Sequence, residues 1–565
     1  MSMPEALLPT QLALLFRRLD PQLDERVLAL VHELSSANLA GHVCLPLAHR
    51  PEHQALLRSP LVGRPGAYTP LVLDEVGRLY FARHWFDEAR LAQALIALAQ
   101  TQITLPPAQV RPVLQALFPS AAANGPDRQK LAAALAARQR LLVISGGPGT
   151  GKTTTVVRLL AMLASLAERP LVMKMAAPTG KAAARLTESV RAARAGLPVA
   201  ESVRRQLPDS AETLHRLLGL RPGVATPRHH AGNPLPLDVL VVDEASMIDL
   251  DLMARTVEAL PSQARLILLG DRDQLASVEA GSVLGDICAA VTYRPSTLGW
   301  LQEAAGDSLL ASDSPPSALA DCVALLTHSH RFSAQSGIGE LARWVNQGDA
   351  ARSLAVLQSA QWPEVSLQAT LDDDQLLQRR QPYWQAVTAS ANLPDLQQAF
   401  TAFMLLAAER RQVDDINRRM EAQCEAAGLK EPGRVWYAGR PVMISENDYG
   451  LGLFNGDIGF AVARADGLRV AFPSADGGWR EFAPGRLPAH DTVFAMTVHK
   501  SQGSEFDEVC LLLPDTPTPL LNRALVYTAL TRARQRFVVA GAASVWEQGI
   551  QYAPVRHSGL ADRLR

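Results

Sequence analysis

Residues 146–154, GGPGTGKTT, have the residue types and the spacing of a loop that binds phosphate. Glycines allow the backbone to curl so that several N–H groups point at one phosphate, at the positive end of the following helix. In such a loop Lys152 reaches the β- and γ-phosphates, and the Thr153 hydroxyl holds Mg²⁺. The sequence therefore predicts a nucleoside triphosphate site formed by Gly146, Gly147, Pro148, Gly149, Thr150, Gly151, Lys152, Thr153 and Thr154.

Hydrolysis of a triphosphate bound at such a loop also needs acidic residues, and the sequence has an acidic pair in a suitable position. Asp243 and Glu244 follow the apolar run 239–242, and the carboxyl ends of parallel strands face the crevice into which the loop opens. Asp243 is expected to hold the Mg²⁺ shell, and Glu244 to orient and deprotonate the attacking water. Gln274 follows the next apolar run; it is either a sensor of the γ-phosphate or a solvated loop residue, and the sequence leaves both open.

Apolar runs and helical spacing predict the elements that position these side chains. Residues 141–144 favour a buried strand that leads into the loop, and the apolar spacing within 156–163 favours a helix that leaves it. Similar runs predict parallel strands, buried on both faces, at 171–175, 238–242 and 265–269. A second α/β pattern has predicted strands at 403–406, 493–497, 509–513 and 537–540.

Three domains are predicted along the chain. Residues 1–115 favour a small, mostly helical domain with a hairpin in 70–85, followed by an α/β domain at 116–320 and another at 321–565. Residues 306–321 are expected to link the two α/β domains flexibly. A β-rich insert is predicted at about 434–487, from short apolar runs separated by the turns Asn455-Gly456 and Asp466-Gly467.

Composition agrees with a multidomain globular protein. The 565 residues are too many for one core, and 48% hydrophobic with 20% charged residues is ordinary for such proteins. Five scattered cysteines without a CxxC pair argue against a disulfide framework or a zinc site and favour the cytoplasm. The formal net charge of −1 excludes a partner held by bulk positive charge alone, so a nucleic acid would need a local track.

The motifs taken together resemble those of superfamily 1 DNA helicases of the RecD branch, which is the alpha subunit of exodeoxyribonuclease V (RecBCD). The resemblance covers nearly the whole chain, including GHVCLPL (41–47) and LYFARHW near the N-terminus. It implies two RecA-like P-loop NTPase domains, with an SH3-like barrel at the β-rich insert. The motifs, in order, are APTGKAAARL (177–186), AETLHRLLG (211–219), VVDEASM (241–247), LLGDRDQLASVEAG (268–281), TVHKSQGSEF (497–506) and YTALTRAR (527–534).

The resemblance also implies roles for residues that match each motif. Gln129 would read the adenine edge, Gly503 and Glu505 would touch phosphate and ribose, and Arg331 and Arg532 would reach the γ-phosphate from the second lobe. A guanidinium delivered across a cleft stabilises the charge of the transition state. Contacts to the phosphates of single-stranded DNA are implied for Thr179, Lys181, Thr213, His215, Thr497, His499 and Lys500.

Together these features predict an ATP- and Mg²⁺-dependent helicase that moves 5′ to 3′ on DNA, a polarity taken from the resemblance. Its expected partners are DNA, as a single strand with a 5′ end or a duplex end, and RecB and RecC in a heterotrimer, with residues 1–115 docking onto RecC. No nuclease centre is found, so cutting is expected of RecB. A free-standing RecD-like helicase and a regulatory ATPase or scaffold subunit are the alternatives.

Overall fold

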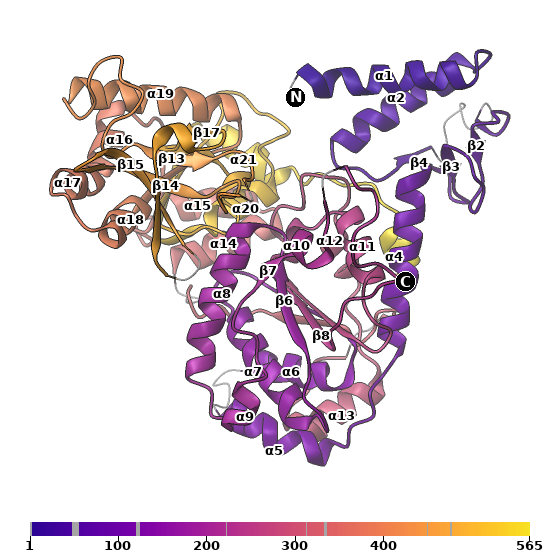
Figure 1. The fold of residues 1–565 in the computed structure, drawn as a ribbon. Helices are drawn as coiled ribbons and strands as arrows, with labels where there is room; N and C mark the ends of the chain where they lie inside the picture. The colour runs from indigo at the N-terminus through magenta and orange to yellow at the C-terminus, as the bar shows by residue number, and fades with distance from the viewer. Residues whose placement is uncertain are drawn as a thin grey trace.

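Two parallel β-sheets flanked by helices form the main body of the protein (Figure 1). We call them the first lobe, whose strands lie between residues 141 and 326, and the second lobe, whose strands lie between 365 and 540. This confirms the predicted α/β fold with parallel sheets. The computed structural model describes residues 3–47, 56–119, 125–221, 223–311, 314–332, 336–448, 450–474 and 477–565.

The sheet of the first lobe has the strand order β10-β5-β9-β8-β6-β7, and all its strands are parallel. Because β5, β9 and β8 are neighbours, the loops that leave their carboxyl ends lie side by side. The strands are β5 (Leu141–Gly146), β6 (Met173–Ala177), β7 (Glu212–Thr213), β8 (Val239–Val242), β9 (Arg265–Gly270) and β10 (Val323–Leu326).

Helices cover both faces of this sheet and bury their apolar sides against it. Residues 131–137 of α6 are all buried, and α7 buries a run that includes Val156, Leu159, Leu160 and Leu163, as their helical spacing predicts. The helices are α5 (Pro107–Leu117), α6 (Arg128–Arg138), α7 (Lys152–Leu166), α8 (Gly180–Ala195), α9 (Glu201–Arg204), α10 (Leu214–Leu218), α11 (Leu250–Glu258), α12 (Val283–Ile287) and α13 (Pro295–Ala305).

The first lobe extends beyond the boundary expected at residue 320. Strand β10 pairs with β5 in parallel register, Val323 opposite Val143, so the chain from 306 to 321 leads back into the same sheet rather than into the next domain. A four-residue apolar run does not show from sequence alone which sheet it joins. Its pairing with a strand far back in the chain assigns it to the first lobe. The chain leaves the first lobe only after Leu326.

The second lobe is a parallel sheet with the order β11-β20-β19-β12-β18. The predicted strand at 493–497 is shorter than expected: only 495–497 pair with β12, and Val493 N donates instead to Pro441 O of the insert at 3.1 Å. The strands are β11 (Val365–Gln368), β12 (Phe403–Ala407), β18 (Ala495–Thr497), β19 (Phe506–Leu512) and β20 (Ala533–Ala540). The helices are α14 (Gly337–Gln347), α15 (Ala350–Gln358), α16 (Asp373–Arg379), α17 (Gln381–Thr388), α18 (Leu393–Thr401), α19 (Arg410–Ala426), α20 (Arg523–Leu530) and α21 (Ala543–Gln551).

The predicted β-rich insert is an antiparallel sheet with the order β16-β15-β14-β13-β17. It has a small core of its own, built around Val442, Val470 and Phe472. Its last strand lies beyond the expected end at residue 487. The strands are β13 (Pro441–Ile444), β14 (Ile458–Arg464), β15 (Gly467–Pro473), β16 (Trp479–Phe482) and β17 (His490–Thr492).

The N-terminal part has a separate core formed by two helices and a small sheet. The predicted hairpin is present as the antiparallel pair β3–β4. Helix α4 (Ala82–Gln100) packs on α11 and shares the core of the first lobe, so the separate unit ends near Phe81 rather than at 115. Its elements are α1 (Met3–Leu19), α2 (Glu25–Leu39), β1 (Leu45–Pro46), β2 (Val62–Gly63), β3 (Leu71–Leu73) and β4 (Arg78–Phe81).

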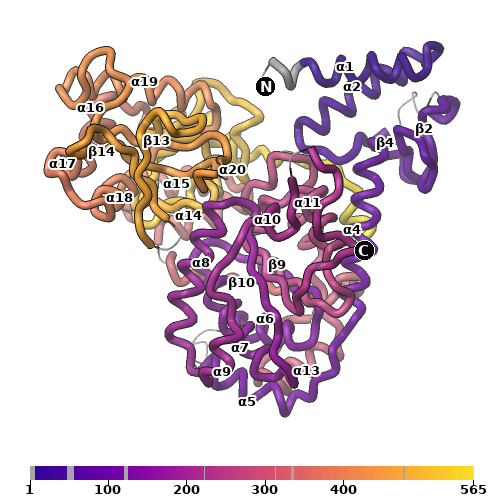
Figure 2. The backbone as a smooth tube through the Cα atoms, viewed as in Figure 1, coloured from indigo at the N-terminus to yellow at the C-terminus, as the bar shows by residue number. Residues whose placement is uncertain are grey.

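Residues 553–565 leave the second lobe and return to the first, beside α4 (Figure 2). Helix α22 (Leu560–Arg563) packs on α4 and α12, and Arg563 Nε donates to the buried Glu88 carboxylate at 2.9 Å. Val43 N donates to His557 O at 2.8 Å. This segment therefore joins the N-terminal unit, the first lobe and the second lobe. No helix in the described ranges has both the length and the apolar character needed to cross a membrane.

Candidate functional site

The phosphate loop connects β5 to α7, as its sequence predicts. Gly149 and Gly151 have φ angles of +74° and +78°, in the left-handed region where glycine is favoured. Lys152 is the first residue of α7, and its Nζ donates to Gly146 O at 2.6 Å and to Gly147 O at 3.1 Å. The lysine thus folds back over the loop, with its charge held at the position where a phosphate would lie.

The loop opens into a cavity of about 290 Å³ between the two lobes. Every residue from Pro148 to Thr154 lines it, whereas Gly146 and Gly147 line a second cavity on the other side of the loop. The remaining lining residues are Ala182, Arg185, Leu186, Ser189, Asp243, Glu244, Asp271, Gln274, Arg331, Gly503, Glu505 and Arg532. The structure therefore brings the predicted loop, acidic pair and arginines to one place.

The acidic pair lies at the end of β8, at the wall of this cavity. Glu244 has a φ of +51°, a conformation that is strained for a glutamate and that turns the chain sharply after the strand. Burial, followed by the neighbouring charge of Glu244, raises the pKa of Asp243 to about 6. Two adjacent carboxylates at the wall of a cavity favour a bound cation beside them.

Gln274 and Arg532 come from opposite lobes and bind each other. Arg532 Nη2 donates to Gln274 Oε1 at 3.0 Å, and both side chains are at least 92% buried. Gln274 also donates to Asp271 Oδ2 at 3.0 Å. Gln274 is buried at the cavity wall, which disfavours the solvated loop residue.

Arg331 lies on the connection that runs from β10 to the second lobe, directly over the phosphate loop. Ser329 Oγ donates to Pro148 O at 3.0 Å, and His330 N donates to Gly149 O at 2.8 Å. A Cβ atom on Gly149 would lie 2.3 Å from Arg331 Cβ. Arg331 was expected on the second lobe; instead the crossover segment carries it, and Gly149 provides the space for it.

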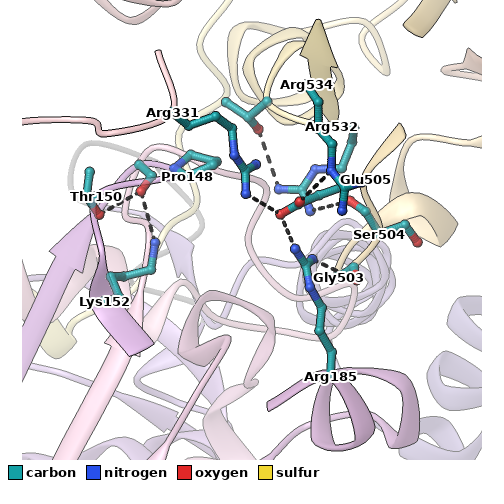
Figure 3. Close-up of polar contacts among 12 residues, drawn as sticks. Pro148, Thr150, Lys152, Arg185, Arg331, Gly503, Ser504, Glu505, Arg532 and Arg534 are labelled. Carbon is teal, nitrogen blue, oxygen red and sulfur yellow. Dashed lines mark hydrogen bonds and ion pairs between the residues drawn. The ribbon is translucent and has the colours of Figure 1, made fainter. Parts of the chain in front are cut away.

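Glu505 is surrounded by arginines from both lobes (Figure 3). Arg331 Nη2 donates to Glu505 Oε1 at 2.9 Å, Arg534 Nε donates to Oε2 at 3.2 Å, and Arg185 pairs with Oε1. Despite burial, Arg185 and Arg331 lower the pKa of Glu505 to about 2. The resemblance implies a ribose contact for Glu505, whereas here its carboxylate binds guanidinium groups.

Sequence reasoning did not single out Arg185. It lies on α8, one turn after Lys181, and its Nη1 also donates to Gly503 O at 3.1 Å across the lobe interface. A spacing of four residues within the motif 177–186 places both side chains on one face of the helix. That spacing could have pointed to Arg185 as a further residue of the site.

Gln129, the predicted adenine reader, lies against the phosphate loop. Its Nε2 donates to Thr150 O at 2.9 Å and lies 3.1 Å from the ring Nε2 of His330. A Cβ atom on Gly151 would lie 2.4 Å from Gln129 Nε2, so the glycine permits this contact. Gln129 does not itself line the cavity.

The first-lobe residues implied in DNA contact lie at the edge of the sheet away from β5. Thr179 and Thr213 follow the neighbouring strands β6 and β7, and their hydroxyls cap α8 and α10 by accepting from Ala182 N and Arg216 N at 3.2 Å each. His215 is exposed. Burial lowers the pKa of Lys181 to about 8, with Asp457 of the insert acting in the opposite direction.

The second-lobe residues implied in DNA contact follow β18, the edge strand of the other sheet. Thr497 Oγ1 accepts from Lys500 N at 3.4 Å, and Lys500 Nζ lies 3.8 Å from Asp491 Oδ2. Burial, with Arg556 as a further contribution, lowers the pKa of His499. In both sheets these residues therefore lie at the carboxyl ends of strands at or next to a sheet edge, and none of them lines the nucleotide cavity.

Two sequence families match this chain at the segments that form the cavity. The AAA domain matches residues 129–280, from Gln129 past Gln274, and the UvrD-like helicase C-terminal domain matches residues 492–540. The second match includes Gly503, Glu505 and Arg532.

Curated relatives match over most of the chain. The RecBCD enzyme subunit RecD of Mycolicibacterium smegmatis is 40% identical over 551 residues, covering 94% of this chain and 90% of the relative. RecD of Haemophilus influenzae is 38% identical, with 87% and 80% covered. The ATP-dependent RecD2 DNA helicase of Deinococcus radiodurans is 30% identical over 86% of this chain and 59% of the relative. This chain therefore belongs to the RecD family of RecBCD enzyme subunits.

Proposed function

We propose that this protein is an ATP-dependent 5′-to-3′ DNA helicase and translocase, the RecD subunit of a RecBCD helicase-nuclease that acts in double-strand break repair by homologous recombination. The observation that carries the proposal is the cavity of about 290 Å³ between the lobes, where the phosphate loop and acidic pair of one lobe face Arg532 of the other. The crossover residue Arg331 completes it. The similarity to an ATP-dependent DNA helicase supports the DNA substrate, and the polarity is the one implied by the family resemblance.

ATP hydrolysis is assigned to residues of this cavity. Lys152 exchanges its carbonyl partners for the phosphates, and the loop N–H groups surround them. Thr153 and Asp243 offer the hydroxyl and carboxylate oxygens that Mg²⁺ prefers, and the bound ion neutralises phosphate charge. Glu244 orients and deprotonates the attacking water, while Gln274, Arg331 and Arg532 respond to the γ-phosphate.

The motor cycle follows from the origin of these residues on two lobes. With ATP bound, Arg331 and Arg532 draw the lobes together, and hydrolysis removes the charge that holds them. If the two lobes release the DNA in turn, one cycle of closing and opening of the lobes moves the protein one step along the strand. Separating one DNA step costs about 1.4 kcal/mol, which a hydrolysis cycle exceeds.

The DNA track is assigned to the carboxyl ends of β6 and β7 in the first lobe and of β18 in the second. Thr179, Lys181, Thr213 and His215 contact the strand from the first lobe, and Thr497, His499 and Lys500 from the second. Hydroxyls, backbone N–H groups and a few cations hold phosphates without a large net charge. This accounts for DNA binding by a chain with a formal net charge of −1.

RecB and RecC are the assigned partners, in a heterotrimer in the cytoplasm, and the nuclease centre is assigned to RecB. We assign the docking surface for RecC to the N-terminal unit, since α1 exposes leucines at helical spacing along its length. The two lobes are assigned as RecA-like P-loop NTPase domains, and the antiparallel insert as a barrel of the SH3 type.

The alternatives are less well supported. The RecD subunit of M. smegmatis is 40% identical over 94% of this chain, whereas the RecD2 helicase is 30% identical over 86% of it. This favours a subunit over a free-standing enzyme. The complete acidic pair and both arginines at the cavity favour an active ATPase over a scaffold.

A strand-displacement assay tests the proposal. Duplexes with either a 5′ or a 3′ single-stranded tail are incubated with this chain, alone and with RecC and a RecB subunit whose own ATPase is disabled. We expect ATP-dependent displacement from the 5′-tailed duplex, abolished by Lys152→Gln. Displacement from 3′ tails only, or displacement that persists in Lys152→Gln, would refute the assignment.

A further inference from the structure

Tyr527 of the second lobe reaches the loop that follows β9 in the first lobe. The Tyr527 hydroxyl donates to Asp271 Oδ2 at 3.1 Å, across the lobe interface. Tyr527 is 5% exposed and Asp271 2% exposed. Unlike Asp271, Tyr527 does not line the nucleotide cavity; it lines the second cavity, of about 660 Å³, behind the phosphate loop. The tyrosine therefore contacts the machinery from outside the site.

The hydrogen bonds continue from Asp271 to the arginine of the cavity. The oxygen that accepts from Tyr527 also accepts from Gln274 Nε2 at 3.0 Å, and Gln274 Oε1 accepts from Arg532 Nη2 at 3.0 Å. An ionised carboxylate only accepts, so it binds the amide nitrogen of Gln274 and leaves the amide oxygen toward Arg532. Asp271 thus sets the direction in which Gln274 points.

Two features hold Tyr527 in place. Thr528 Oγ1, on the next residue, accepts from Leu275 N at 2.9 Å, so helix α20 and the loop after β9 are joined twice. A Cβ atom on Gly147 would lie 2.9 Å from the Tyr527 hydroxyl oxygen. The glycine of the phosphate loop therefore leaves room for the tyrosine, and the pKa of Tyr527, raised by burial and by Asp271, keeps the hydroxyl protonated as a donor.

We propose that Tyr527 is a positioning residue for ATP hydrolysis, which acts through Asp271 to hold Gln274 and Arg532 in their closed arrangement. Tyr527 and Arg532 belong to one segment of the second lobe, and Asp271 and Gln274 to one loop of the first. When the lobes close, the Tyr527 hydroxyl fixes the carboxylate of Asp271. Asp271 in turn orients the amide of Gln274, which accepts the hydrogen bond from Arg532. The inference rests on the proposed ATPase function of this cavity.

The test is Tyr527→Phe, which removes one hydroxyl and keeps the ring. The full chain is assembled with RecC and a RecB subunit whose own ATPase is disabled, and kcat and KM for ATP are measured with single-stranded DNA. A hydrogen bond to a buried charge is lost, so we expect kcat to fall about tenfold. We expect KM for ATP to change less than about twofold, because Tyr527 lies outside the cavity.

Tyr383→Phe is the matched control, since the Tyr383 hydroxyl is also buried but donates to Gly439 O, at 2.8 Å, within the second lobe. It should leave kcat unchanged although its melting temperature falls. In a double-mutant cycle, Tyr527→Phe should add little to the kcat loss of Gln274→Ala. A kcat within twofold of wild type, an equal loss in Tyr383→Phe, or full additivity with Gln274→Ala would each overturn the inference.

The wild-type complex separates the two claims. Absence of DNA-stimulated hydrolysis in wild type would refute the proposed function itself. An active wild type beside an equally active Tyr527→Phe variant would refute only the positioning role.

Discussion

Three side chains that line the nucleotide cavity are each held by a neighbour within the protein. Lys152 rests on loop carbonyls, Gln274 has its amide directed by Asp271, and Arg331 pairs with Glu505. These partners keep buried charges satisfied before a phosphate arrives, which an isolated buried charge could not tolerate. Nucleotide binding is therefore an exchange of partners rather than the creation of new buried charge.

A substitution at Gly149 tests how closely the crossover segment must lie to the phosphate loop. In Gly149→Ala the new methyl group would overlap Arg331 Cβ at 2.3 Å, so Arg331 should be displaced and DNA-stimulated ATPase activity should fall at least about tenfold. Gly428→Ala is the control, because Gly428 has φ +73° but nothing within 4 Å. Both variants bear a backbone cost of about 1 kcal/mol, seen in their melting temperatures. Equal ATPase activities in the two variants would contradict the account.

At the scale of elements, the sequence predicted those strands, loops and helices whose formation depends on residues close together in the chain. The strand, loop and helix around Lys152 follow from apolar runs and glycine spacing, and the acidic pair follows from its place after β8. Strand β10 and the returning segment at 553–565 were not predictable, because their partners lie far away in sequence. Whether Gln274 is buried depends on Arg532 of the other lobe, which a single-sequence reading does not reveal.

Helix α1 is the element whose surface predicts a partner. Leu14 and Leu15 are each 48% exposed, and Leu15→Glu would place a charge on the apolar face. If RecC covers this face, burying the leucine is worth about 2 kcal/mol, so the affinity for the RecB–RecC pair should fall at least tenfold. The ATPase activity of the chain should not change.

Leu310→Glu provides the comparison for that measurement, since Leu310 is 82% exposed on the first lobe. Binding titrations of both variants against RecB–RecC measure whether only the substitution on α1 lowers the affinity. Equal affinities for the two variants would show that α1 is not the docking surface.

At the scale of the molecule, Glu505 joins the lobes through Arg185 and Arg331 and should give stability a specific pH dependence. Its folded-state pKa is lowered from 4.5 to about 2, so its contribution, on the order of 3 kcal/mol, is fully present above pH 4.5. The contribution decreases as the pH falls from 4.5 toward 2, because the unfolded chain takes up the proton first. Glu505→Gln should therefore lower the urea midpoint at pH 7, with a smaller difference at pH 4. A difference that grows toward low pH would contradict the ion-pair arrangement.

The central claim concerns the whole molecule: one nucleotide cavity is completed by an arginine from the opposite lobe. Arg532→Gln tests it in the full chain with RecC and ATPase-disabled RecB, by kcat for DNA-stimulated ATP hydrolysis. Arg536→Gln, four residues further along the chain on strand β20 and 49% exposed at its side chain, is the control. The account predicts a kcat loss of at least about a hundredfold for Arg532→Gln with nucleotide binding retained, and wild-type kcat for the control. A kcat for Arg532→Gln within twofold of wild type would contradict it.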